Sequence, residues 1–325
     1  MNAFAGYSPV LVTGAAGFVG ACLVRALLAR GATVHALLRP QSKPWRLQDV
    51  RTQLTVHHAD LRDRAQVAQV LDAVHPVLVY HLATYGAYER QADAERILAS
   101  NIFGTHYLLE ECERCGVRLL VNAGSSSEYG YKSGPMKETD VLEPASHYAV
   151  AKAAQTHLCT LKARAGKLPV VVFRLFSVYG PWEEPDRLMP TMIRRARAGL
   201  PLEMAAPDLA RDFVYVDDVV RAMLDVPRLR DLSGEILNLG SGIETTLASV
   251  VATIKELLHS PSAVQWGAMP PRRWDTSRWV CDPSHTRQVL GWSAQVNLRD
   301  GLSRMAAWMQ QVGDNYGAND ARAAD

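Results

Sequence analysis

The chain has 325 residues, of which 48% are hydrophobic and 21% charged, and its formal net charge is +2. This length provides for one large domain or two smaller ones with a substantial core. The charges are scattered, so no concentrated basic face is expected to bind nucleic acid or an anionic membrane. We find no signal-peptide pattern and no apolar run long enough to span a bilayer. The five dispersed cysteines indicate a reducing compartment, and we expect a cytoplasmic protein without a metal site.

Short apolar runs alternate with helical patterns through the first half of the chain. We predict strands at 10–12, 33–38, 54–58, 77–80, 117–123 and 170–173, and helices at 18–30, 94–115 and 146–165. Val- and Leu-rich runs separated by helices are typical of a parallel sheet that is covered on both faces. The predicted fold class is therefore α/β, with a Rossmann-type doubly wound parallel sheet.

Beyond Gly180 the elements become shorter, and Pro and Trp become more frequent. We predict a dinucleotide-binding domain over residues 1–180 and a smaller, interleaved α/β substrate domain over 181–312. The runs 214–216 and 236–238 are expected to return to the main sheet. Residues 313–325 are polar and are expected to form a flexible tail.

A glycine-rich turn, Thr13–Gly20, lies between the first strand and the first helix, with glycines at 14, 17 and 20. Glycines allow a tight turn and close backbone approach, and the N-terminus of the helix offers free N–H groups to a pyrophosphate. This position makes a dinucleotide site the favoured interpretation, with a purely structural turn as the alternative. The cofactor contacts predicted here are Gly14, Ala16, Gly17, Phe18 and Val19.

The end of the second strand carries Arg39, and no acid precedes Asp49. A guanidinium there suits a 2′-phosphate, whereas an acid would accept bonds from the ribose hydroxyls of NAD. We therefore favour NADP(H), with NAD(H) possible if Arg39 only stacks on the adenine. Asp60, after the third strand, is a candidate acceptor for the adenine amino group. A simple turn or helix cap is an equally good interpretation of Asp60.

Tyr148 and Lys152 are one helical turn apart and therefore share a helix face. A phenol titrates near 10, which is too high for ready proton transfer at neutral pH. A neighbouring ammonium lowers the pKa of the phenol by stabilising the phenolate. Ser125 lies at the carboxyl end of the strand predicted at 117–123, where open α/β sheets bind ligands. Together with the glycine turn, these three residues predict a carbonyl-reducing or alcohol-oxidising site.

The chain resembles the extended short-chain dehydrogenase/reductase family, in its nucleotide-sugar epimerase, dehydratase and reductase branch. The resemblance extends to about residue 310 and rests on motifs at 13–20, 60–61, 81–83, 101–105, 125–130, 148–152, 174–181, 211–218, 238–240 and 290–292. It implies a Ser125, Tyr148, Lys152 triad and a homodimer formed through the helices around 94–115 and 146–165. It also implies cofactor contacts from Leu61, Leu82, Ala83, Asn101 and Phe176.

Departures from the family pattern narrow the expected reaction. Sugar 4,6-dehydratases carry an acid two residues after the catalytic Ser or Thr, where this chain has Ser127, with Glu128 one step later. Dehydration is therefore disfavoured unless Glu128 slips into that place. The segments 81–86 and 266–270 resemble 4-ketoreductases of nucleotide-linked 6-deoxy sugars, such as CDP-abequose synthase.

The leading prediction is thus reduction at C4 of a nucleotide-linked 4-keto sugar with NADPH, in which Tyr148 supplies the proton. A 4-epimerase with tightly bound NAD is the alternative, and the intact triad argues against a non-catalytic relative. Ser177 stands where relatives often carry an Asn that contacts the sugar diphosphate. Arg211 and Arg273 are candidates for binding the diphosphate, with surface or domain-bridging salt bridges as the alternative. The full set of expected substrate contacts is Thr84, Tyr85, Ser126, Ser127, Ser177, Arg187, Arg211 and Arg273.

Overall fold

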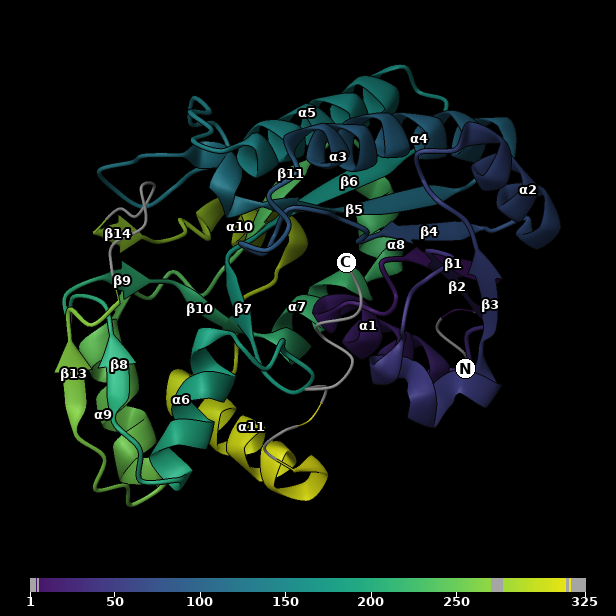
Figure 1. Ribbon diagram of the computed structural model, residues 1–325. Coiled ribbons are helices and arrows are strands. Elements are labelled where there is room, and N and C mark those ends of the chain that lie inside the picture. Colours follow the sequence, from purple (N-terminus) through teal and green to yellow (C-terminus); the bar gives the residue numbers. More distant parts are fainter. Residues whose placement is uncertain (1–3, 5, 270–276, 314–315, 317–325) are drawn as a thin grey trace.

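A seven-stranded sheet forms the centre of the computed structural model, which describes residues 4, 6–269, 277–313 and 316 (Figure 1). The strand order is β11-β6-β5-β4-β1-β2-β3, and every neighbouring pair is parallel. This confirms the predicted doubly wound parallel sheet. The strands are β1 (Val10–Thr13), β2 (Val34–Leu38), β3 (Thr55–His58), β4 (Leu78–His81), β5 (Leu119–Ser125), β6 (Val170–Leu175) and β11 (Ile236–Leu239).

Alternate side chains along each strand enter two different cores. In β1, Val10 and Val12 pack into the core beneath α1 (Phe18–Leu28), α7 (Val216–Met223) and α8 (Val226–Asp231). Leu11 faces the opposite core, formed with α2 (Arg64–Val74), α4 (Gly104–Arg114) and α5 (His147–Arg164). Burial on both faces explains why inner strands such as β1 and β6 are largely apolar instead of alternating, whereas the edge strand β3, of sequence TVHH, is partly exposed. Figure 1 shows the two helical layers above and below the sheet.

The helix predicted at 94–115 is present but is not regular throughout. It consists of α3 (Ala94–Leu98), a π-helical turn (Ala99–Phe103) and α4. The helix predicted at 146–165 is α5, and the Ser146 side chain caps it by accepting a hydrogen bond from the Ala149 N–H. Helix α2 was not among the predicted elements. Two 3₁₀ segments, Trp45–Gln53 and Ser126–Tyr129, complete this part of the fold.

The rest of the chain builds a third core beside the carboxyl ends of the strands. Its helices are α6 (Leu188–Arg197), α9 (Leu247–Leu257) and α11 (Leu298–Val312), while α10 (Ser284–Leu290) packs beside β11 and adds Leu290 to the core beneath α1. Its short strands form three small sheets, namely β7 (Ser177–Tyr179) with β10 (Phe213–Tyr215), β8 (Leu202–Met204) with β13 (Val264–Trp266), and β12 (Thr245–Thr246) with β9 (Ala210–Arg211) and β14 (Arg278–Trp279). Among the described residues, no helix combines the length and hydropathy that crossing a membrane requires.

One of the two segments expected to return to the main sheet does so. Ile236–Leu239 pairs with β6, as expected, whereas the prediction for 214–216 was wrong. Strand β7 leaves the line of β6 at Phe176, and Phe213–Tyr215 pairs with β7 in a sheet of its own. Val216 then begins α7 instead of extending a strand. The division of the chain into domains at residue 180 stays a prediction.

Candidate active site

Three glycines shape the turn between β1 and α1, and two of them leave no room for a side chain. A Cβ on Gly14 would lie 2.5 Å from the backbone of Leu82 and Ala83, and the φ of Gly14 is +69°. A Cβ on Gly20 would lie 2.1 Å from the carbonyl oxygen of Gly14. The turn therefore packs directly against the loop after β4 and against its own helix. Only glycine is compatible with such close approach.

The N-terminus of α1 has the properties that a dinucleotide pyrophosphate needs. Gly17 is the N-cap residue, no side chain caps the helix, and no acid lies in its first turn. The N–H groups of the first turn are therefore directed out of the helix without a competing carboxylate. Ala16, Phe18 and Val19, predicted as cofactor contacts, belong to this turn. The residues present thus fit a bound dinucleotide.

The adenosine end of such a cofactor would meet charged residues of both signs. Arg39 follows β2 directly, and its charge contributes to lowering the pKa of Asp60. The main cause of that lowered pKa is Arg62, whose guanidinium bonds both carboxylate oxygens of Asp60 at 2.6–3.1 Å. Asp60 also accepts from the Arg62 backbone N–H, so it forms the turn that was the alternative interpretation. A contact between Asp60 and adenine stays a prediction.

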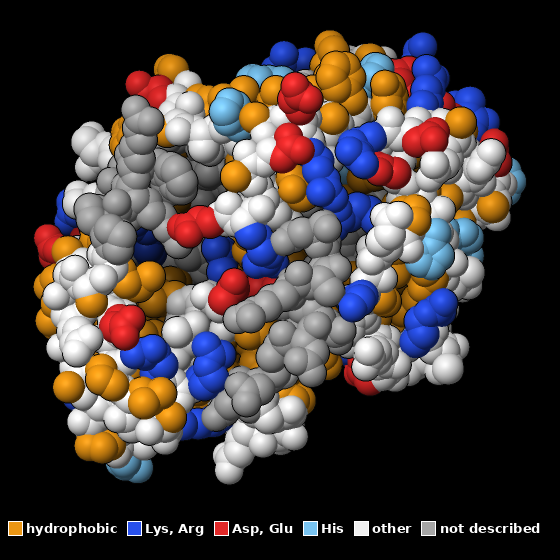
Figure 2. Space-filling model, in the orientation of Figure 1, with side chains coloured by type: hydrophobic (Ala, Val, Ile, Leu, Met, Phe, Trp, Pro, Cys, Tyr) orange, Lys and Arg blue, Asp and Glu red, His pale blue; other side chains and the backbone are white. Residues whose placement is uncertain are grey.

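Tyr148, Ser125 and Thr84 meet at the carboxyl edge of the sheet. Burial raises the pKa of Tyr148 above its ordinary value of 10.0, while side-chain hydrogen bonds with Ser125 and Thr84 oppose this effect. Ser125 is the last residue of β5, and Tyr148 lies in the first turn of α5. Figure 2 shows a hollow between the main sheet and the part of the chain that builds the third core, with basic and acidic side chains at its rim. The first two members of the predicted triad are therefore within hydrogen-bonding reach of each other.

Asn101 fixes the loop that supplies Thr84. Its side-chain oxygen accepts from the Thr84 hydroxyl at 3.3 Å and from the Tyr85 N–H at 2.9 Å, and its side-chain nitrogen donates to the Tyr85 carbonyl at 2.7 Å. Asn101 is buried within the π-helical turn. It thereby positions a neighbour of Tyr148, whereas the direct cofactor contact proposed for it stays a prediction.

Lys152 lies one turn further along α5, and its side chain is only 3% exposed. Its ammonium donates to the Ala123 carbonyl of β5 and to Gln155 Oε1, both at 2.5 Å. Burial lowers the pKa of Lys152 to about 8, although the charges of Glu128 and Cys159 oppose this change. The ammonium therefore loses its proton more readily than an exposed lysine does.

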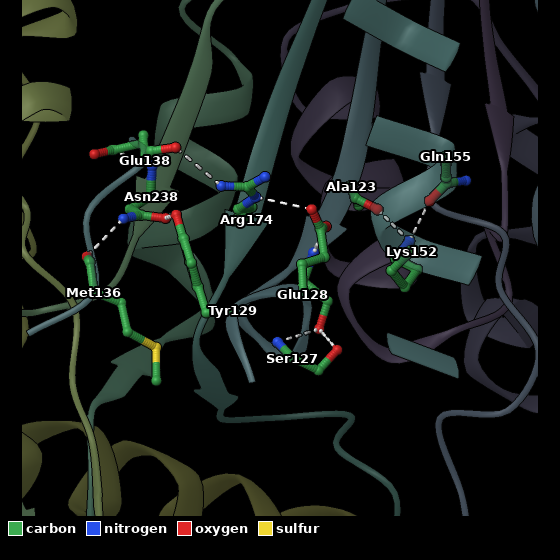
Figure 3. Close-up of polar contacts among 11 residues, drawn as sticks. Ala123, Ser127, Glu128, Tyr129, Met136, Glu138, Lys152, Gln155, Arg174 and Asn238 are labelled. Atoms are coloured by element: carbon green, nitrogen blue, oxygen red, sulfur yellow. Dashed lines mark hydrogen bonds and ion pairs between the residues drawn. The ribbon is translucent and has the colours of Figure 1, made fainter. Parts of the chain in front are cut away.

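Glu128, the possible base of a dehydratase, is fully buried and already paired. Its Oε1 accepts from the Ser125 backbone N–H at 2.8 Å, and its Oε2 accepts from Arg174 Nε at 2.8 Å. Figure 3 shows this pair between Ser127 and the Tyr129–Asn238 hydrogen bond. Glu128 thus holds the backbone of Ser125 in place.

The other predicted residues lie around this edge. Ser127 Oγ is 2.8 Å from Ser125 Oγ, and Ser126 Oγ accepts from Trp279 Nε1 at 2.8 Å, which joins the sheet to the smaller part. Arg187 precedes α6, and its charge lowers the pKa of Tyr148. The remaining predicted residues are placed as follows: Leu61, Tyr85 and Phe176 are buried, Leu82 and Ala83 pack on Gly14, Ser177 begins β7 and Arg211 ends β9, while Arg273 lies outside the described residues.

Sequence reasoning missed Gln155, which contacts the Lys152 ammonium, and His81, which contacts Gln155. Gln155 follows Lys152 by three positions and shares its helix face, so this spacing could have identified it. His81 ends β4 and is buried. Sequence reasoning also missed Arg174 as the partner of Glu128, since nothing in the sequence pairs two charges 46 positions apart.

Residues 10–240 match the model of the NAD dependent epimerase/dehydratase family. The chain belongs to this family. Its relatives include a probable dTDP-glucose 4,6-dehydratase of Sinorhizobium fredii, 30% identical over 94% of this chain and 93% of the relative. Among solved structures, MoeE5 in complex with UDP-glucuronic acid and NAD has a TM-score of 0.82 at 33% identity, covering 93% of this chain and 99% of MoeE5. The UDP-glucose 4-epimerase of Thermus thermophilus, in complex with NAD, has a TM-score of 0.82 at 30% identity, covering 93% of this chain and 98% of the epimerase.

These relatives confirm the extended short-chain dehydrogenase/reductase resemblance at the level of the epimerase/dehydratase family. Two of them are named as a probable dehydratase and a 4-epimerase, and the finer resemblance to CDP-abequose synthase-like 4-ketoreductases stays a prediction. The solved neighbours named above bind NAD, and the preference for NADP(H) predicted from Arg39 also stays a prediction.

Proposed function

We propose that this member of the epimerase/dehydratase family is a nucleotide-sugar 4-epimerase that uses NAD. The observation that carries the proposal is the group that Tyr148 forms with Ser125 and Thr84 beside the glycine turn, where both side chains lie close enough to lower the pKa of Tyr148. Such a group moves one proton on one sugar oxygen, which together with hydride transfer to and from a nicotinamide completes oxidation and reduction at C4. The NAD complexes of a 4-epimerase and of MoeE5 support this choice of cofactor.

Each residue of the group has a distinct task in the proposed reaction. NAD held by the glycine turn and the N-terminus of α1 would supply the reversible hydride transfer at C4. Tyr148 removes the proton from the C4 hydroxyl and gives it back, while Ser125 holds that oxygen through a hydrogen bond. The hydrogen bonds of Ser125 and Thr84 favour the phenolate, since both lower the pKa of Tyr148. Lys152 supplies a positive charge along the same helix face.

The arrangement of Glu128 disfavours the dehydratase reaction. Removal of the C5 proton needs a carboxylate that reaches the sugar, but both oxygens of Glu128 are occupied by Ser125 N–H and Arg174. Its side chain is also completely buried. Releasing it would leave the Arg174 guanidinium, 2% exposed, without its anionic partner, which is strongly unfavourable. The one-residue slip of Glu128 therefore has no support from the geometry.

A second candidate is the NADPH-dependent reduction of a 4-keto sugar. The observation in its favour is Arg39 at the end of β2, near Asp60 and Arg62. Two guanidiniums with one carboxylate between them suit a 2′-phosphate better than two ribose hydroxyls. Arg39→Ala should then weaken NADPH binding at least tenfold and leave NADH binding within about threefold. Equal losses for both cofactors would remove this candidate.

The test of the proposed function follows C4 epimers of UDP-, dTDP-, GDP- and CDP-linked hexoses by NMR with a catalytic amount of NAD. The epimerase proposal expects equilibration of the two C4 epimers for at least one nucleotide sugar, without net consumption of cofactor. Stoichiometric oxidation of NADPH by a 4-keto sugar would instead support the reductase. Accumulation of a 4-keto-6-deoxy sugar would show a dehydratase and contradict both proposals.

A further inference from the structure

A continuous set of buried side chains extends from Lys152 away from the sugar-facing side of the site. Lys152 Nζ donates to Gln155 Oε1 at 2.5 Å, and Gln155 Nε2 lies 2.7 Å from Thr105 Oγ1 and 3.1 Å from His81 Nε2. His81 Nδ1 lies 2.7 Å from Thr13 Oγ1, at the start of the glycine turn. All of these side chains are nine-tenths or more buried. Figure 3 shows the first link, in which Gln155 and the Ala123 carbonyl flank the ammonium.

The chemistry of these groups fixes the orientation of the Gln155 amide. A lysine ammonium only donates hydrogen bonds, so the amide oxygen must face Lys152 and the amide nitrogen must face His81 and Thr105. His81 Nε2 also lies 2.9 Å from Thr105 Oγ1, which donates to the Asn101 carbonyl, so Nε2 can either donate to Thr105 or accept from Gln155. In either tautomer His81 is a neutral ring hydrogen-bonded on both sides, with Nδ1 2.7 Å from Thr13 Oγ1. Burial and the charge of Lys152 agree with this, since they lower the pKa of His81 to about 3.

We propose that Gln155 is a positioning residue for Lys152, with Thr105 as the acceptor that holds the Gln155 amide in its orientation. The amide oxygen keeps the ammonium over β5 and keeps it charged within the core. This proposal rests on the proposed function only for its kinetic consequence, because the contacts themselves do not depend on the reaction. In the proposed reaction a charged Lys152 adds to the groups that favour the phenolate of Tyr148, so we expect Gln155 to influence the alkaline limit of turnover.

Other groups around Lys152 act in known directions. Glu128, from the 3₁₀ segment, and Cys159, further along α5, raise the pKa of Lys152, while burial lowers it by more. His81, from β4, is neutral and adds no charge. Tyr148, on the same helix, adds a negative charge only as the phenolate. Gln155 is thus a neutral acceptor among these groups. A single substitution can remove its amide oxygen or replace the amide with a carboxylate, and the charges already present stay the same.

The test compares Gln155→Met and Gln155→Glu, which have similar size. Lys152 is titrated by NMR in protein carrying carbon-13-labelled lysine, with its resonance assigned by its loss in Lys152→Met. Loss of a hydrogen bond to a charged group should lower the Lys152 midpoint by about one to two pH units in Gln155→Met. The added carboxylate should raise the midpoint in Gln155→Glu. Gln288→Met and Gln288→Glu, on the exposed face of α10, are the matched controls and should leave it unchanged.

The alkaline limb of the kcat profile should move in the same direction as the Lys152 midpoint in each variant. Midpoints that stay unchanged, or that shift in the same direction in both Gln155 variants, would overturn the proposal. If Gln155→Met does not fold, the comparison of wild type with Gln155→Glu still decides the direction of the shift. Opposite midpoint shifts in a protein that acts on no nucleotide sugar would support the positioning role and contradict the proposed function instead.

Discussion

At the scale of single residues, the site depends on how one phenol is surrounded. Burial opposes ionisation of Tyr148, and the hydroxyls of Ser125 and Thr84 oppose the effect of burial. The nearest buried anion, Glu128, is neutralised by Arg174 and holds Ser125 through its backbone N–H. Glu128, which could have been a second catalytic base, therefore instead stabilises the site of Tyr148 by holding Ser125 in place.

Tyr148→Phe removes the proton donor while it keeps the ring that fills the same space. We expect turnover to fall by about 10²- to 10⁴-fold, because general acid–base catalysis contributes on this order. Binding of NADH, measured by its fluorescence, should change little and serves as the control for folding. Turnover within threefold of wild type would contradict the assignment of Tyr148.

Glu183 is a second residue whose environment can be tested. It is buried after β7, its Oε2 has no hydrogen-bond partner among the described residues, and burial raises its pKa from 4.5 to about 8. The folded state therefore holds a proton that the unfolded state releases between these values, so folding stability falls as the pH rises from about 5 to about 8. Glu183→Gln should remove this part of the pH dependence.

Urea unfolding at the two pH values measures this effect. At about pH 8 we expect Glu183→Gln to be more stable than wild type by on the order of 4 kcal/mol, with a much smaller difference near pH 5. Asp186→Gln, at an exposed position of the same loop, is the control. An equal effect of Glu183→Gln at both pH values would show that Glu183 does not carry the proton.

At the scale of elements, the turn between β1 and α1 is the most constrained part of the site. The loop after β4 packs on Gly14, and α1 packs on the turn through Gly20. Both contacts join backbone to backbone, so neighbouring side chains cannot move aside to admit a larger residue. The position of the α1 N-terminus, and with it the pyrophosphate site, therefore depends on these glycines.

Gly20→Ala should displace the turn, because the new Cβ would lie 2.1 Å from the Gly14 oxygen. We expect a loss of stability of about 1–3 kcal/mol, typical of overpacking, and NAD affinity reduced at least tenfold. Gly134→Ala is the control, since a Cβ there meets nothing within 4 Å. Calorimetric NAD titration of both variants gives the comparison, and equal affinities would refute the role of the turn.

The sequence predicts those elements whose signals are local. The inner strands of the sheet could be located because burial on both faces makes them largely apolar. Because the strands are parallel, their carboxyl ends lie at one edge of the sheet, and this edge is where the site was expected. Helix α2 also carries a local signal, Val67, Val70, Leu71 and Val74 at helical spacing, and it could have been predicted. The partner of Phe213–Tyr215 could not, because three apolar residues do not specify which strand they pair with. The contacts of Glu128 and Gln155 depend on residues distant in sequence, which spacing does not reveal.

At the scale of the whole molecule, α4 and α5 form one outer face of the sheet (Figure 1). Phe103, Val150 and Leu161 on this face are 56%, 44% and 65% exposed. Val150 and Leu161 are three helical turns apart on α5, so they align on one side of the helix. Large apolar side chains exposed together indicate an interaction surface, which supports the proposed homodimer through these helices.

Leu161→Asp places a charge in the middle of that surface. We expect light scattering to show a dimer for wild type and a monomer for Leu161→Asp, since an unpaired charge is costly in an apolar interface. Val141→Asp is the control, because Val141 is 77% exposed but lies outside both helices. A monomeric wild type, or a dimer that tolerates Leu161→Asp and not Val141→Asp, would contradict this interface.

The central claim is that Tyr148 permits oxidation at C4 of a nucleotide sugar by a bound nicotinamide. The most direct measurement mixes the NAD complex with a nucleotide sugar deuterated at C4 and records the absorbance of reduced nicotinamide together with the product. We expect transient reduction in wild type but not in Tyr148→Phe, and a C4 epimer that retains the deuterium. An absence of reduction with every nucleotide sugar, or equal reduction in Tyr148→Phe, would contradict the claim.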